Sequence, residues 1–126
     1  MDRRTCLSLL AAAFSGRAPA AQRSIQLHVD LDVEPARERE MLRNYRRIFR
    51  PAIRKQPGFL GVRLLRLRRV VTGEASKDSN YRLVIRFQTE EQRQAWVASE
   101  DHQRAWPAIE RTLRPGRLRA LLWEAV

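Results

Sequence analysis

The sequence predicts a single α+β domain with a ferredoxin-like βαββαβ order and an antiparallel sheet. Three segments, residues 25–33, 59–70 and 81–88, alternate apolar and polar residues as strands do. One segment between the first two strands and one after the third strand carry apolar residues at helical spacing. A last strand can form near the C-terminus. The length of 126 residues leaves room for one such domain.

The first strand candidate has a period of two over nine residues, which predicts a strand with one packed face. Its apolar face consists of Ile25, Leu27, Val29, Leu31 and Val33. The helix that follows can begin at Pro35, because proline is well placed in a first turn. Its apolar stripe consists of Met41, Leu42, Tyr45, Ile48, Phe49, Ala52 and Ile53. Pro51 is expected to kink this helix, and Pro57-Gly58 to end it.

The second strand is expected over residues 59–70, with Leu60, Val62 and Leu64 on one face. Residues 72–80 are polar and predict a loop, and residues 81–88 predict the third strand. Thr89 and Gln92 form a capping-box pattern that begins a second helix. Ser99 can cap a continuation, which Pro107 should bend and Pro115-Gly116 should end. Residues 117–126 can then return as the last strand.

The charge is high but it is not concentrated. The net charge is +11, and only Lys55 and Lys77 of the 25 basic residues are lysines. A nucleic-acid reader usually gathers basic residues on one face or arm, whereas these arginines occur in every predicted element. The distribution therefore favours a soluble surface over a dedicated anionic partner. The single cysteine, Cys6, lies in the N-terminal segment, so the remaining chain has no disulfide or thiolate chemistry.

Residues 1–21 are expected to be an export signal, with the folded domain over residues 22–126. A short charged start precedes about ten mostly apolar residues, and small residues around Ala18–Ala20 fit a cleavage site. The segment Asp2–Leu7 also resembles a twin-arginine motif. The protein is therefore expected to be exported, periplasmic or secreted, and without a stable membrane anchor, because the apolar stretch is too short. The alternative is a disordered or helical N-terminal extension.

Three places in the sequence are informative together: Gln56-Pro57-Gly58-Phe59-Leu60-Gly61 at the entry to the second strand, the step from the third strand into Gln88-Thr89-Glu90-Glu91, and the helix break from Trp96 to His102. In this order they resemble the antibiotic biosynthesis monooxygenase family of dimeric α/β barrels. The resemblance runs from about Ile25 to Trp123. It implies a homodimer whose sheets pack into a barrel, with a pocket between sheet and helices in each subunit. It also implies O2-dependent oxidation of a small aromatic phenol or quinol, often without a cofactor.

Such chemistry needs a base and a dry pocket more than it needs a metal. The candidate catalytic residues are His28, Asp30 and His102. Asp30 is two residues from His28 on the same strand face and could raise its proton affinity. Alternatively, His28 has no catalytic role and lies on a strand face that is solvated or buried in the dimer. The resemblance places His102 near the pocket mouth, although a histidine on a helix surface is the ordinary alternative.

The candidate substrate pocket combines one charged and five aromatic side chains: Tyr45, Phe49, Arg82, Phe87, Trp96 and Trp106. Core packing is the alternative explanation for the aromatic residues, and an exposed position or dimer ion pairs could explain the arginine. The family's haem-degrading branch has a histidine ten residues after the tryptophan that Trp96 matches. That position carries Trp106 here, so haem is not expected. No other cofactor and no metal site are expected either.

Two other functions share this element order. A small-molecule-binding barrel without catalysis would need the same pocket. An RNA-binding module would display aromatic residues on the first and third strands after a Lys/Arg-Gly-aromatic pattern. The first strand has no aromatic residue and residues 81–87 contain no glycine, so nucleic acid is not an expected partner.

Overall fold

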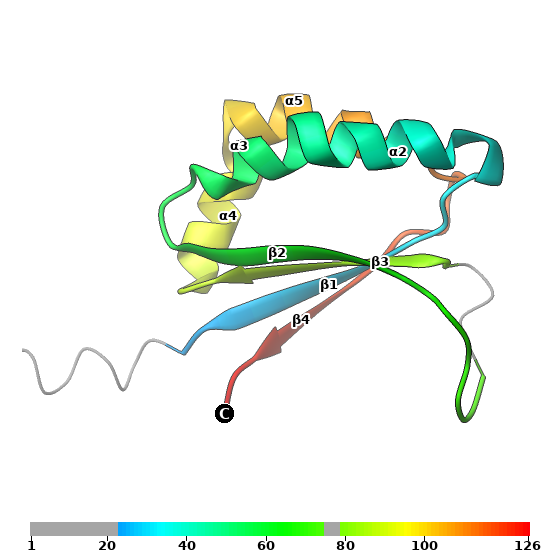
Figure 1. Ribbon diagram of the computed structural model, residues 1–126. Coiled ribbons are helices and arrows are strands. Elements are labelled where there is room, and N and C mark those ends of the chain that lie inside the picture. Colours follow the sequence, from blue (N-terminus) through cyan, green and yellow to red (C-terminus); the bar gives the residue numbers. More distant parts are fainter. Residues whose placement is uncertain (1–22, 75–78) are drawn as a thin grey trace, which may run out of the picture.

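The structure is a computed structural model that describes residues 23–74 and 79–126. Its four-stranded antiparallel sheet has the order β2-β3-β1-β4. The strands are β1 (Ile25–Leu31), β2 (Phe59–Arg66), β3 (Tyr81–Phe87) and β4 (Arg119–Glu124). All described helices lie on one face of this sheet (Figure 1). The predicted ferredoxin-like α+β fold is confirmed. The expected export signal lies outside the described residues.

The apolar face of β1 forms the floor of the core, as its alternation predicts. Val29 and Leu31 are buried, and so is Val33, which forms an isolated bridge with Leu113 beyond the strand's end. The side chains of Asp30 and Asp32 are buried too. Their carboxylates need partners at such depth, and arginines from β3, β4 and the segment before β4 provide them.

The first helical segment stays helical through Pro51 because the turn before it widens. The segment comprises η1 (Pro35–Arg37), α2 (Glu38–Asn44), the π-helical turn η2 (Tyr45–Phe49) and α3 (Arg50–Arg54). The Arg50 N–H donates to the Tyr45 carbonyl, five residues back. A π turn absorbs a local disruption of the α-helical ladder. Pro51 then falls in the first turn of α3, where its missing N–H has no cost.

The start of β2 differs from the predicted alternation. A register shift between Phe59 and Gly61 inserts an extra residue, and Phe59 packs against the core with Val62 and Leu64. Leu60 is exposed instead, so the prediction that it shares a face with Val62 and Leu64 is wrong. The extra residue of a bulge shifts the alternation, so the side chains before it point to the opposite face of the sheet from the one expected. The strand also ends at Arg66 rather than Val70, because β3 begins at Tyr81 and offers no further pairing partner.

The last two helices are α4 (Glu90–Ala98) and α5 (Glu100–Glu110). The predicted capping box is present: the Gln92 N–H donates to Thr89 Oγ1, and the Thr89 N–H donates to the Gln92 side chain. Ser99 joins the two helices, because its hydroxyl donates to the Trp96 carbonyl and accepts from the His102 N–H. The helix α5 runs through Pro107 to Glu110.

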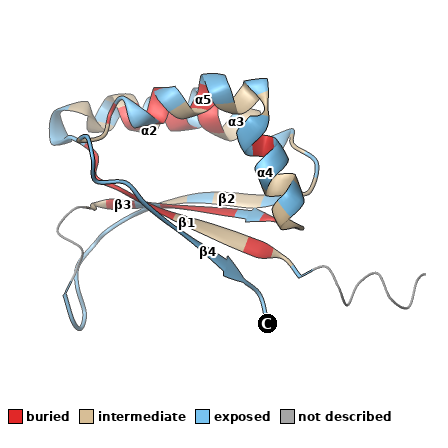
Figure 2. Ribbon diagram, turned by 180° about the vertical axis from the view of Figure 1, so that it is seen from behind, coloured by how far each residue is buried: buried red, intermediate tan, exposed pale blue. Residues whose placement is uncertain are grey.

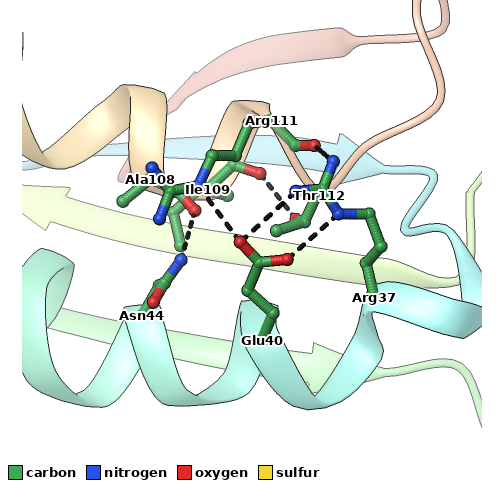
Figure 3. Close-up of polar contacts among 7 residues, drawn as sticks. All are labelled: Arg37, Glu40, Asn44, Ala108, Ile109, Arg111 and Thr112. Carbon is green, nitrogen blue, oxygen red and sulfur yellow. Dashed lines mark hydrogen bonds and ion pairs between the residues drawn. The ribbon is translucent and has the colours of Figure 1, made fainter.

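Polar contacts between α2 and the C-terminal end of α5 hold the helical layer together (Figure 3). The buried Asn44 amide donates to the Ala108 carbonyl at 2.9 Å. Glu40 accepts from Arg37 at 3.0 Å and from Arg111 at 3.1 Å. These groups satisfy part of the polar end of α5. They fix the angle at which α5, which carries His102 and Trp106, lies over the sheet.

The two faces of the sheet have different surroundings. The core lies between sheet and helices and is built on Leu31, Met41, Phe49, Ile53 and Phe87. The opposite face has no described helix on it (Figure 1), and β4 is exposed along its length (Figure 2). No helix among the described residues has the length and apolar character to cross a membrane.

Candidate functional site

A cavity of about 310 Å³ lies between the helix-facing side of the sheet and the helices α4 and α5. Most of its lining is aliphatic or aromatic: Leu27, Val29, Phe49, Leu83, Ile85, Trp96, Val97, Trp106, Leu118 and Ala120. Leu118 and Ala120 are themselves exposed, so the cavity opens beside β4. A concave apolar site with few polar groups is the usual form of a small-molecule pocket.

His102 is the titratable side chain in this pocket that can act near neutral pH. Its ring contacts Trp96 edge-on, with 5.0 Å between centroids, and stacks on Trp106 at 6.4 Å. Burial lowers the pKa of His102 below its ordinary value, because desolvation disfavours the charged imidazolium. The ring is therefore neutral at pH 7 and can accept a proton or a hydrogen bond.

The second polar group of the pocket is Arg93, which the sequence analysis did not single out. Its Nε and Nη2 donate to the two carboxylate oxygens of Glu90, each at 2.7 Å. The side chain is only 18% exposed. This bidentate bond raises the pKa of Arg93 and lowers the pKa of Glu90. The spacing of Arg93 from Trp96, one helical turn, was the available sequence signal.

The predicted pocket residues divide between this site and the core. Phe49, Trp96 and Trp106 line the cavity together with His102. Tyr45 and Phe87 are buried but do not line it: Tyr45 stacks on Phe49 with 6.2 Å between centroids, and Phe87 packs edge-on against Phe59 at 6.0 Å. Tyr45 therefore lies behind a residue of the pocket wall, and Phe87 belongs to the core.

The structure places the other predicted site residues on the opposite side of the sheet. His28, Asp30 and Arg82 occupy register positions on the face without helices, because side chains alternate along a strand. His28 contacts the Gln26 side chain at 3.1 Å and the Trp123 ring. His28 and His102 therefore do not act on one ligand within a subunit.

Asp30 forms ion pairs with two arginines. Arg82 Nε donates to one carboxylate oxygen at 2.8 Å, and Arg119 Nη2 donates to the other at 2.8 Å. Burial alone would raise the pKa of Asp30, but the hydrogen bonds and charges of both arginines outweigh it, and the pKa lies below its ordinary value. The sequence could not show that Asp30 forms ion pairs with arginines of the two neighbouring strands rather than with His28.

A second buried carboxylate anchors the segment that leads into β4. Asp32 accepts from Arg114 at 3.2 Å and from Arg117 at 3.3 Å, and the Arg114 N–H donates to the Asp32 carbonyl. This segment carries Leu118 to the pocket opening. Asp32 thus helps to position one wall of the site. No described residues form a cluster of three or more histidine, cysteine or acidic groups that could hold a metal.

Comparison with known proteins agrees with this fold. The antibiotic biosynthesis monooxygenase family matches residues 24–108. No curated protein sequence matches the chain. Among solved structures, a mutant of SnoaB, a cofactor-independent oxygenase from Streptomyces nogalater, is 18% identical, with a TM-score of 0.63 over 82% of this chain and 93% of that one.

Two further structures share the fold. A dimeric ferredoxin-like protein of unknown function from Jannaschia is 18% identical, with a TM-score of 0.68 over 81% of this chain and 99% of that one. A candidate antibiotic biosynthesis monooxygenase from Caulobacter crescentus is 18% identical, with a TM-score of 0.67 over 83% and 92%. At this identity the structural neighbours show the fold, and the family match covers most of the folded domain. The chain belongs to the antibiotic biosynthesis monooxygenase family.

Proposed function

We propose that the protein is a cofactor-independent oxygenase that oxidises a small aromatic phenol or quinol with O2, with His102 as the base. One observation carries the proposal: a neutral, half-buried imidazole lies between two indole rings in a mostly apolar cavity. SnoaB, a structural neighbour with a cofactor-independent reaction, supports the same class of chemistry.

The proposed reaction begins when a bound hydroxyl donates its proton to His102. The resulting phenolate is electron-rich and can be oxidised by O2 in a site that excludes water. For a phenol with an open ring position, one oxygen atom becomes a second ring carbonyl and the other leaves as water. The ring then supplies all the electrons, and the atoms balance as phenol plus O2 giving quinone plus water.

The neighbours of His102 fit this role. Trp96 and Trp106 offer flat apolar surfaces against which an aromatic ring can stack. Ser99 fixes the first turn of α5 through its bond with the His102 N–H. Burial lowers the pKa of His102 and so keeps this base unprotonated at neutral pH, and the proton acceptor is present without a carboxylate partner.

We also propose that a second copy of the chain covers the face of the sheet without helices. Leu65, Leu121 and Trp123 are exposed on this face, and the Trp123 ring contacts the His28 ring. An uncovered sheet face with large apolar side chains is typical of an interface. The dimeric Jannaschia protein of the same fold supports this assembly. His28 would then lie in the interface rather than in a substrate pocket.

Export through the N-terminal segment remains a separate proposal, which cell fractionation of the full chain with and without residues 1–21 would test. For the oxygenase, the test is O2 uptake by the purified protein with hydroxylated naphthalenes and quinols. We expect uptake that His102→Gln abolishes and His28→Gln leaves in place. Ligand binding without any O2 uptake would instead support the non-catalytic binding protein.

A further inference from the structure

We propose that the pocket selects a planar aromatic ligand that bears a carboxylate group, and that Arg93 binds this carboxylate. The inference uses the proposed function only in taking the cavity as the ligand site. It names a ligand class and a specificity-determining residue that the oxidation chemistry alone does not require. It rests on the hydrogen bonds that the guanidinium of Arg93 makes with Glu90.

A guanidinium has five N–H donors arranged along fixed edges of a plane. Glu90 occupies one edge, because it accepts from Nε and from Nη2. The edge between Nη1 and Nη2 has no acceptor among the described residues, although the side chain is largely buried. That free edge matches the two oxygens of a carboxylate.

The position of Arg93 places its side chain next to a ligand in the cavity. Arg93 lines the same cavity as Trp96, Trp106 and His102. It lies one helical turn before Trp96, so the two side chains project from the same face of α4. A ring stacked at the tryptophans could direct a carboxylate to Arg93 and a hydroxyl to His102. Few other polar groups exist in the pocket to satisfy a buried anion.

Glu90 orients the guanidinium without filling its binding capacity. The pair is an i,i+3 contact in the first turn of α4, where the helix dipole also favours the carboxylate of Glu90. An arginine held in one orientation loses little conformational entropy when it binds a ligand. Glu90 is therefore a positioning residue for Arg93.

The test compares 2-naphthoate with 2-naphthamide, which have nearly the same shape but differ in charge. We expect calorimetry on the full chain to show that the naphthoate binds roughly tenfold tighter. Arg93→Gln should remove most of this preference and leave naphthamide binding within about twofold. Arg93→Lys should show an intermediate preference for naphthoate, because lysine keeps the charge but cannot donate two parallel hydrogen bonds to a carboxylate.

The matched control is Arg104→Gln. Arg104 also forms an i,i+3 ion pair, with Asp101 at 2.7 Å, but it lies outside this pocket and is 69% exposed. This variant removes the same charge and should leave the preference unchanged. The fold should survive Arg93→Gln, because Glu90 keeps its hydrogen bond from Gln94. Far-UV circular dichroism checks this point.

Equal binding of both probes by the wild type would overturn the inference, as would an equal loss of both in Arg93→Gln. Neither result would affect the oxygenase proposal. Conversely, a carboxylate preference without O2 uptake on any phenol would overturn the oxygenase proposal and support this inference. Failure of both probes to bind would overturn the assignment of the cavity as a ligand site, and the inference with it.

Discussion

Gly58→Ala tests how the turn after α3 and the start of α4 depend on each other. Gly58 has φ of +81°, a left-handed conformation that costs an alanine about 1 kcal/mol. An added Cβ would also lie 1.9 Å from the side-chain oxygen of Gln92. Gln92 would have to move, and its bond to the Thr89 N–H in the capping box would be lost, at about 1 kcal/mol more. The expected total loss is about 2 kcal/mol.

The matched control is Gly73→Ala. Gly73 has the same φ of +81°, but a Cβ there meets nothing within 4 Å. It should therefore lose only the conformational part, about 1 kcal/mol. Urea unfolding of both variants measures the difference. Adding Gln92→Ala to Gly58→Ala should cost less than the sum of the two single changes, because the clash disappears. A Gly58→Ala variant no less stable than Gly73→Ala would refute the reasoning.

Three further predictions concern charge and assembly. The pKa of His102 is lower in the folded protein than in the unfolded chain, so below about pH 6.5 the unfolded chain binds a proton more readily. Urea unfolding should therefore show that the wild type loses stability relative to His102→Gln as the pH falls; parallel pH profiles of the two proteins would contradict this. Asp30→Asn should cost about 1–3 kcal/mol at neutral pH, since Arg82 and Arg119 lose their shared carboxylate. The difference should vanish in acid as the wild-type carboxyl is protonated below its lowered pKa; a constant difference would count against it. Trp123→Glu should convert a dimer to a monomer in light scattering with unchanged circular dichroism, and a wild type that is already monomeric would rule out the interface.

The alternating and helical patterns of the sequence were sufficient for the fold. The capping box at Thr89 lies where expected, and so does the helical stripe of Met41 to Ile53 except for Ile48, which is exposed. The first strand forms as expected but ends at Leu31 rather than at residue 33. Two local features were not accessible. The bulge at Gly61 depends on pairing with β3, and the π turn before Pro51 depends on how the helix packs. Neither leaves a mark in the spacing of apolar residues.

The site was predicted only in part, for a physical reason. His102, Phe49, Trp96 and Trp106 do meet in one cavity. Strand alternation places His28 and Asp30 on the face opposite the apolar one, and the structure shows that the cavity lies on the apolar, helix-covered side. Arg93 appeared as one arginine among many. Its spacing of one helical turn from Trp96 was the one sequence signal, whereas its burial and its bond to Glu90 appear only in the structure.

We expect the chemistry to occur in the helix-side cavity and to depend on His102. The most direct measurement is the steady-state rate of O2 uptake with 2-naphthol or a related quinol for the wild type, His102→Gln and His28→Gln under identical conditions. The account predicts a loss of at least about 100-fold in kcat for His102→Gln and less than about threefold for His28→Gln. A full rate in His102→Gln, or a loss confined to His28→Gln, would contradict it.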